Sequence, residues 1–167
     1  SQIVLATAKS LQGKSDIEAI RKILQQSDNA GEFKNTFLGQ QVSKSMTIDD
    51  ASIQLPADYD PTGRPWYTLA KTEGSTNFTE PYFDANENYL VISVATPIYE
   101  NGNIFGVTGA DIQLTDIVNI VNRVDYLGLG YAFLVTKDGK ILSHPDKSLD
   151  NKNINDVFEE NLGMSSS

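Results

Sequence analysis

The feature that most constrains the fold of this chain is a pair of β-rich runs joined by a tight turn. The runs cover residues 89–99 and 104–114, and both are rich in β-branched and aromatic residues. Between them stands Glu100-Asn101-Gly102-Asn103, in which the Asn-Gly pair favours a hairpin turn because both positions tolerate positive φ. The two runs are therefore predicted to be neighbouring antiparallel strands.

The N-terminal part of the chain has a helical pattern. Residues 3–11 are mostly apolar and are predicted to be the last turns of a helix that starts upstream. Ser15 and Glu18 have the spacing of a capping box, so a second helix is predicted to begin there. The segment 27–31, Ser-Asp-Asn-Ala-Gly, is predicted to end this helix.

The remaining predicted elements are short. Strands are expected at 37–39 and 45–48, followed by a loop at 55–63 and a helix from Arg64 to about Lys71, because Pro65 is tolerated in a first helical turn. After the long hairpin, the pattern predicts a helix over 117–124 that is capped by Thr115 or Asp116. A second hairpin is expected next, with strands at 131–135 and 140–143 and a turn at Asp138-Gly139. The last predicted element is a helix over 155–161.

These elements predict an α/β (α+β) fold of two modules in series, with antiparallel sheets flanked by helices. Residues 1–30 would form N-terminal helices that serve as a spine and dimerisation element. Residues 31–114 would form a first, complete module, and 115–167 a linker helix with part of a second module. The second module has two strands and one helix, so it is predicted to be incomplete.

Composition excludes several classes of function. The chain has 22 acidic and 13 basic residues, a net charge of −9, and no basic cluster, which argues against binding nucleic acid. It has no cysteine, so disulfides, thiolate nucleophiles and cysteine metal sites are excluded. Its apolar runs are of strand length, short of the roughly 20 residues of a spanning helix, and no signal-peptide pattern is present. If the parent protein is anchored in a membrane, its spans would therefore lie outside this sequence.

Seven residues between positions 58 and 111 have the chemistry of a ligand site. They are Tyr59, Arg64, Trp66, Tyr67, Tyr82, Asp84 and Asp111. A free amino acid carries a carboxylate beside an ammonium, so its site needs a planar cationic donor on one side and carboxylates on the other. Arg64 can supply the donor, while Asp84 and Asp111 can hold the ammonium. Asp111 lies in an otherwise apolar strand, where a charge is costly unless it is paired.

In type and order, these residues resemble the signature of the amino-acid-binding branch of the double Cache (dCache) sensor family of bacterial chemoreceptors. That signature is a tyrosine, an arginine five residues on, a tryptophan and tyrosine after one intervening residue, then a tyrosine, an aspartate and a later strand aspartate. The resemblance spans nearly the whole chain. The two modules would then be PAS-like Cache modules, with 31–114 membrane-distal and Leu142-Ser143-His144-Pro145-Asp146 near the start of the membrane-proximal one.

The resemblance also implies roles. Arg64 and Trp66 would contact the ligand carboxylate, and Tyr59 and Asp111 its amino group. Asp84 would assist, and Tyr67 and Tyr82 would line the pocket. The protein would be the periplasmic or extracellular part of a membrane-anchored methyl-accepting chemotaxis receptor, homodimeric in the full receptor, that binds an amino acid without a cofactor.

Each of these residues also has a plainer interpretation. Arg64 could be a surface arginine paired with Asp58 or Asp60, and Trp66 and Tyr67 could be core aromatics. Asp84 could simply begin the turn 84–88, which reads Asp-x-Asn-x-Asn like a calcium loop. The EF-hand interpretation fails because the required glycine and glutamate are replaced by Tyr89 and Ala95, although another calcium geometry stays open. His144, the single histidine, is interpreted as structural.

Two other classes of function remain as alternatives to the amino-acid sensor. One is a ligand-free module that mediates receptor dimerisation. The other is a carbohydrate hydrolase that uses Asp84 and Asp111 as its two catalytic carboxylates. Such an enzyme needs one of the two to be protonated, whereas Arg64 is expected to keep both ionised, which argues against this alternative. The sensor could equally serve a histidine kinase or a cyclase, since both use this kind of input module.

Overall fold

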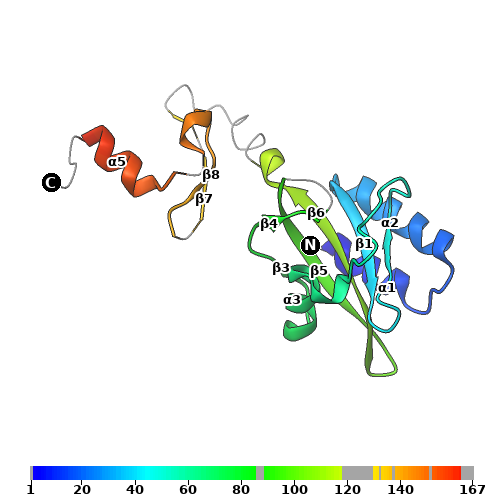
Figure 1. Ribbon diagram of the computed structural model, residues 1–167. Coiled ribbons are helices and arrows are strands. Elements are labelled where there is room, and N and C mark those ends of the chain that lie inside the picture. Colours follow the sequence, from blue (N-terminus) through cyan, green and yellow to red (C-terminus); the bar gives the residue numbers. More distant parts are fainter. Residues whose placement is uncertain are drawn as a thin grey trace. The chain divides into compact units, whose positions relative to one another are not determined.

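The computed structural model describes residues 2–85, 89–117, 130–131, 133–136, 138–150 and 152–162. The chain divides into two compact units, Ser1–Gln113 and Leu114–Ser167 (Figure 1). All seven predicted site residues lie in the first unit. The predicted three-part division at residues 30 and 114 stays a prediction.

A six-stranded antiparallel sheet forms the centre of the first unit. Its strands are β1 (Asn35–Gln40), β2 (Met46–Ile48), β3 (Asn77–Phe78), β4 (Tyr82–Phe83), β5 (Leu90–Glu100) and β6 (Asn103–Gln113). Their order is β2-β1-β6-β5-β3, and β4 also pairs with β5. The predicted long hairpin is confirmed as β5–β6, and its turn uses positive φ at Asn101 (50°) and Gly102 (79°).

Helices cover both faces of this sheet (Figure 1). On one face, α1 (Gln2–Leu11) and α2 (Ile17–Gly31) pack through buried residues such as Leu11 and Leu24 against Leu38. On the other face, α3 (Pro65–Glu73) packs through Trp66 and Tyr67 against Phe37. The predicted class, a mixed α/β fold with an antiparallel sheet flanked by helices, is confirmed.

Strand alternation decides which residues reach the α3 side. Successive side chains of a strand point to opposite faces. On β6, Val107 packs with the α3 cluster while Ala110 packs with Val4 of α1. Asp111, four residues beyond Val107, therefore lies on the α3 side, as does Asn35, its partner on β1.

Both predicted ends of the second helix need correction. The N-cap is Asp16, whose Oδ1 accepts a hydrogen bond from the Ala19 backbone N–H at 2.8 Å, in place of the predicted Ser15–Glu18 capping box. Glu18 instead forms an ion pair with Arg21 at 2.6 Å. The segment 27–31 stays helical, because burial of Ser27 against Thr7 favours one more turn, and Glu32 closes the helix in a left-handed conformation.

The second unit contains a short hairpin and a helix. They are β7 (Leu134–Val135), β8 (Ile141–Ser143) and α5 (Ile154–Leu162), with a 3-10 turn, η2, at Lys147–Leu149 between them. The predicted hairpin and final helix are confirmed. The linker helix begins at Leu114, directly after the end of β6. Thr115 and Asp116 therefore lie in its first turn, whereas one of them was predicted to precede and cap it. Positions 118–124 of that helix lie outside the described residues.

His144 is part of the packing of the second unit. Its Nδ1 accepts a hydrogen bond from the Asp146 backbone N–H at 2.8 Å, and its Nε2 lies 3.2 Å from the Tyr131 hydroxyl. Its ring packs against the rings of Tyr131 and Phe133, with centroids 5.0 and 5.2 Å away. These contacts support the structural role predicted for it.

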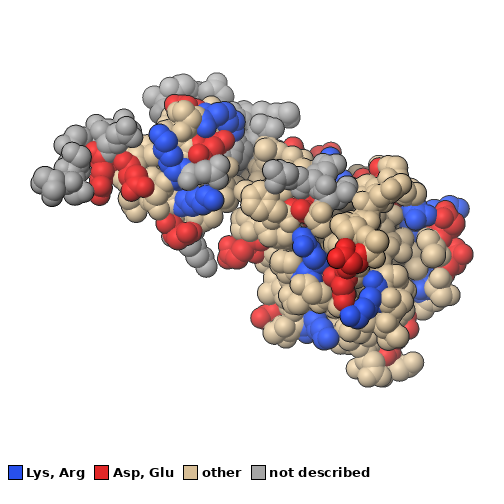
Figure 2. All heavy atoms as spheres, in the orientation of Figure 1, with Lys and Arg blue, Asp and Glu red and all other residues tan. Residues whose placement is uncertain are grey.

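On the described part of the chain, the distribution of charged side chains and the lengths of the apolar helices agree with what composition predicted. Figure 2 shows lysine and arginine side chains scattered among aspartates and glutamates on the visible face, with no basic patch there. Within the residues that were searched, no helix is both long enough and apolar enough to cross a membrane.

Candidate functional site

A cavity of about 680 Å³ opens on the α3 side of the sheet. Six of the seven predicted site residues line it: Tyr59, Arg64, Trp66, Tyr82, Asp84 and Asp111. They come from the loop before α3, the first turn of α3, the β4–β5 region and the end of β6. Segments that are more than 50 residues apart in the chain thus meet in one cavity.

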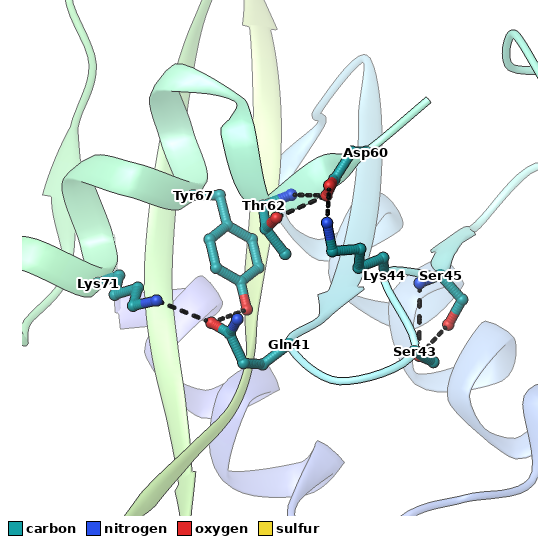
Figure 3. Close-up of polar contacts among 8 residues, drawn as sticks. All are labelled: Gln41, Ser43, Lys44, Ser45, Asp60, Thr62, Tyr67 and Lys71. Atoms are coloured by element: carbon teal, nitrogen blue, oxygen red, sulfur yellow. Dashed lines mark hydrogen bonds and ion pairs between the residues drawn. The ribbon is translucent and has the colours of Figure 1, made fainter. Parts of the chain in front are cut away.

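The segment before α3 is held by short-range contacts. Asp60 accepts hydrogen bonds from the backbone N–H and hydroxyl of Thr62 at 2.9 and 2.6 Å, which starts the 3-10 turn η1 (Pro61–Gly63). Lys44 of the β1–β2 connection adds an ion pair to Asp60 at 2.6 Å (Figure 3). Arg64 then stands at the N-cap of α3 in an extended conformation. These contacts fix the entry into α3 and so the positions from which Arg64 and Trp66 reach the cavity.

Trp66 can pack this close to β1 only because β1 carries a glycine there. A Cβ on Gly39 would lie 2.8 Å from the Trp66 ring and 2.9 Å from Pro61, closer than real Cβ contacts allow. On the neighbouring position of the same face, Phe37 packs against Trp66 with ring centroids 4.7 Å apart. Gly39 is therefore a positioning residue for this wall of the cavity.

Gly39→Ala is expected to displace Trp66 and destabilise the protein by about 1–3 kcal/mol, because the added methyl overpacks a closed site. Chemical denaturation would measure the loss, and Trp66 fluorescence would report the displacement, since it is the single tryptophan of the chain. Gly63→Ala is the matched control, because a Cβ there meets nothing within 4 Å. Equal stability of the two variants would contradict this role of Gly39.

The guanidinium of Arg64 lies between two tyrosine rings, with its carbon 5.9 Å from the Tyr59 centroid and 5.5 Å from the Tyr82 centroid. One amino group donates to the Phe83 carbonyl at 3.2 Å. The Nε is buried and has no hydrogen-bond partner among the described residues. An unpaired buried donor is costly, so the site is suited to a ligand that brings an acceptor, such as a carboxylate.

Asp111 is 4% exposed and forms one end of a hydrogen-bonded chain. Its Oδ1 accepts from the Ser93 hydroxyl, whose oxygen lies 2.6 Å from the Tyr82 hydroxyl. A serine hydroxyl has one proton, so when Ser93 donates to Asp111 it must accept from Tyr82. Burial, with a further contribution from Asp84, raises the pKa of Asp111 to about 7 even though Ser93 and Arg64 act in the opposite direction.

This pKa corrects one prediction. Arg64 was expected to keep both aspartates ionised, but desolvation of Asp111 outweighs the attraction of the arginine. Asp111 is thus half protonated near neutral pH in the ligand-free protein. A bound cation would restore its charge.

The position of Tyr67 also needs correction, because it does not line the cavity. Its side chain is fully buried beside Trp66, and its hydroxyl donates to Gln41 Oε1 at 3.2 Å, an acceptor shared with Lys71 Nζ at 3.1 Å (Figure 3). Burial raises the pKa of Tyr67 to about 12. Neighbouring residues on a helix point about 100° apart, so Tyr67 can pack against Gln41 while Trp66 faces the cavity.

Asp84 lies at the cavity wall, and its backbone N–H donates to the Tyr89 carbonyl at 3.0 Å. Positions 86–88 of the turn considered for calcium lie outside the described residues. In the part of the chain that was searched, no three His, Cys, Asp or Glu side chains are grouped so as to hold a metal ion.

Sequence reasoning missed several residues of the cavity lining and one residue behind it. Ser93, which hydrogen-bonds Asp111 from behind the lining, was overlooked although it is a polar residue inside an apolar strand, which is the signal that identified Asp111. The others line the cavity and have no motif: Asp28, Lys34, Asn35, Asp49, Asp50 and Tyr89 among the polar ones, with Phe37, Met46, Ile48, Ile53 and Leu55 among the apolar ones. They come from separate segments of the chain that only the tertiary structure brings together.

Comparison with known proteins identifies relatives of this chain. The family described as methyl-accepting chemotaxis protein-like, first PDC sensor domain, matches residues 9–119. The methyl-accepting chemotaxis protein PctB of Pseudomonas aeruginosa is 42% identical over 154 residues, which are 92% of this chain and 24% of that protein. The chain therefore spans about a quarter of the length of this relative.

Solved structures have the same fold. The ligand-binding domain of Pseudomonas aeruginosa PctB in complex with L-Gln matches with a TM-score of 0.75 and 40% identity, covering 96% of this chain and 65% of that domain. The ligand-binding domain of the Pseudomonas fluorescens chemoreceptor CtaA in complex with L-isoleucine matches with a TM-score of 0.76 and 33% identity, covering 95% and 65%.

Proposed function

Because the chain belongs to the family of methyl-accepting chemotaxis protein-like first PDC sensor domains, we propose that its cavity binds a free L-amino acid. The protein would be the extracytoplasmic sensor region of a membrane-anchored chemoreceptor, dimeric in the full receptor, that passes ligand binding on as a conformational signal. We propose a binding role without catalysis. The observation that carries this proposal is the Arg64 Nε, which has no hydrogen-bond partner among the described residues, in the same cavity as the buried carboxylate of Asp111.

The two poles of the cavity suit the two charges of an amino acid. The ligand carboxylate would accept hydrogen bonds from Arg64, whose fork matches a carboxylate bidentately, and from the Trp66 indole. The ligand ammonium would lie against Asp111, with Asp84 adding negative charge and Tyr59 a hydroxyl. The ligand carboxylate would give the Arg64 Nε the acceptor that it lacks among the described residues, and the ammonium would offset the burial of the Asp111 carboxylate.

The relatives support the class of ligand but leave its side chain open. PctB was solved with L-Gln and with L-Arg, and CtaA with L-isoleucine, L-valine and L-serine. These ligands share only their amino and carboxylate groups. A site that recognises those groups first would explain such variety.

Binding can be tested with the chain itself. We expect at least one L-amino acid to raise the melting temperature, because a ligand that binds only the folded state stabilises it, and to bind with a Kd of the micromolar order, about −8 kcal/mol. Calorimetry across the twenty amino acids would measure this. Absence of heat with a protein shown to be folded would favour the ligand-free dimerisation module, and turnover of a glycoside would favour the hydrolase.

A further inference from the structure

The cavity extends well beyond the two charged groups of an amino acid. Besides Asp111 and Arg64, its lining includes apolar side chains from β1, β2 and the following loop: Phe37, Met46, Ile48, Ile53 and Leu55. It also includes three further carboxylates, Asp28, Asp49 and Asp50. The cavity therefore has two charged regions, and the side chain of a bound amino acid could follow the path between them.

Strand register gives the length of this path. Asp111 on β6 pairs with Asn35 on β1, and the Asp49 backbone N–H donates to the Thr36 carbonyl at 3.0 Å, so the chain after β2 continues beside β1. Asp50 thus lies next to Asn35, two strands away from Asp111. With strands about 4.8 Å apart, this path is about 10 Å long.

We propose that the acidic end of this cavity, formed by Asp28, Asp49 and Asp50, selects amino acids with a long cationic side chain, such as lysine, arginine or ornithine. This inference rests on the proposed function and names the ligand class of the same site. The α-amino and α-carboxylate groups would bind at Asp111 and Arg64. The methylene stem would span the path past Asn35, and the cationic head would reach the acidic end.

The charge of the whole cavity points to the same class. Five carboxylates line it (Asp28, Asp49, Asp50, Asp84 and Asp111) against two cationic side chains (Lys34 and Arg64). Lys34 lies with its ammonium 5.6 Å from the centroid of the Tyr89 ring. A zwitterion with a neutral side chain leaves this imbalance unchanged, whereas a cationic side chain reduces it and an anionic one increases it.

The environment of Asp28 favours the binding of a cation. Its Oδ1 is buried and lacks a hydrogen-bond partner among the described residues. Burial raises the pKa of Asp28, and the nearby Asp49 carboxylate raises it further. A cationic head at this end would relieve both effects. Asp50 is exposed and hydrogen-bonded to the Ser52 backbone N–H at 2.8 Å, which lowers the pKa of Asp50 and keeps it charged.

Matched ligands separate the side-chain charge from the rest of the molecule. At pH 8, calorimetry on the chain would compare L-lysine with L-norleucine, which has the aliphatic stem without the terminal ammonium, and with L-2-aminoadipate, which has an acidic end. We expect lysine to bind at least about tenfold more tightly than norleucine, and aminoadipate to bind more weakly than either. Cadaverine, which lacks the carboxylate, should bind more weakly than lysine because Arg64 would stay unpaired.

Matched variants locate the effect. Asp28→Asn with Asp50→Asn should bring lysine to within about threefold of norleucine and leave norleucine unchanged, because asparagine keeps the size and the turn at Ser52 but removes the charge. Asp58→Asn, an exposed aspartate outside the cavity lining, should keep the preference.

The outcomes are distinguishable. If wild-type protein binds norleucine as tightly as lysine, the inference is overturned while the proposed function stands. A lysine preference that survives the double substitution overturns the assignment to Asp28 and Asp50, the two carboxylates that it removes. If cadaverine equals lysine, the site binds diamines and the amino-acid class is wrong. Failure of every amino acid to bind overturns the proposed function, and this inference with it.

Discussion

Asp111→Asn is expected to remove most amino-acid binding. The carboxylate is 4% exposed and lies in the same cavity as Arg64, so we propose it as the buried negative pole for the ligand ammonium. Removing one partner of a buried charge pair costs about 3–5 kcal/mol, which corresponds to a loss of roughly two to three decades in Kd. Asparagine is nearly the same size, and its carbonyl can still accept the hydrogen bond from Ser93.

The same substitution should make the ligand-free protein more stable at pH 8. The pKa of Asp111 rises from 3.8 to about 7 on folding, mainly through burial. Because the pKa of Asp111 is higher in the folded than in the unfolded protein, ionising Asp111 lowers the free energy of unfolding. This destabilisation is absent below about pH 4, grows as the pH rises toward 7 and is complete above pH 7. It amounts to a few kcal/mol, on the order of 4. Asparagine avoids it, so the stability gain should shrink toward zero at pH 4.

Ligand binding by the wild-type protein should depend on pH for the same reason. The ligand ammonium favours the carboxylate form of Asp111, which is half populated near pH 7 in the ligand-free protein. Lowering the pH from 8 to 6 is therefore expected to weaken binding by about tenfold. Binding below pH 7 should release a proton, and the Asn variant should show neither effect.

Calorimetry at pH 6 and 8, in two buffers with different ionisation enthalpies, would measure both affinity and proton release. Denaturation of both proteins between pH 4 and 8 would measure the stability effect, with the exposed Asp58→Asn as the matched control. Alanine and its deaminated analogue propionate, each on both proteins, would form a cycle that isolates the contact between Asp111 and the ammonium. A coupling energy near zero would make Asp111 a structural aspartate.

Arg64→Lys is expected to weaken binding nearly as much as Arg64→Ala, by about two decades. Lysine keeps the charge but loses the planar fork and the stacking between Tyr59 and Tyr82. The substitution also removes the Nε donor of Arg64. This donor has no partner among the described residues, and we assign it to the ligand carboxylate. The quenching or enhancement of Trp66 fluorescence on titration would give the Kd of each variant.

Arg21→Lys is the matched control for this substitution. Arg21 lies on α2, outside the cavity lining, and donates to the Ile48 carbonyl at 3.2 Å. Ligand affinity should be unchanged in this variant. If Arg64→Lys retained wild-type affinity, Arg64 would act only as a diffuse positive charge, and its assignment as a bidentate partner would be wrong.

The sequence alone determined the local elements and most of the bipolar end of the site. The Asn101-Gly102 turn, Pro65 at the start of α3 and the hairpin at Gly139 follow from backbone preferences of single residues, which hold in any fold. Asp111 was identifiable because burying an unpaired charge in an apolar strand costs free energy, so such a residue is a candidate for a functional role. Whether the predicted residues touch a ligand stays a prediction.

Only the tertiary structure decided how these elements serve the cavity. Tyr67 matches the motif as well as Trp66, but packing against Gln41 turns it away from the site. Asp16, and not Ser15, caps α2 because the first helical turn begins one residue later than the capping-box pattern suggests.

The tertiary structure also created properties that no local pattern contains. Asp28 and Asp49 lie 21 residues apart and face one cavity only because β2 pairs with β1. The pKa of Asp111 depends on burial and on Ser93, Asp84 and Arg64, which come from other parts of the chain. Register and burial are long-range quantities, set by the whole hydrophobic core, so the electrostatics of the site, and with them its ligand preference, could only come from the folded protein.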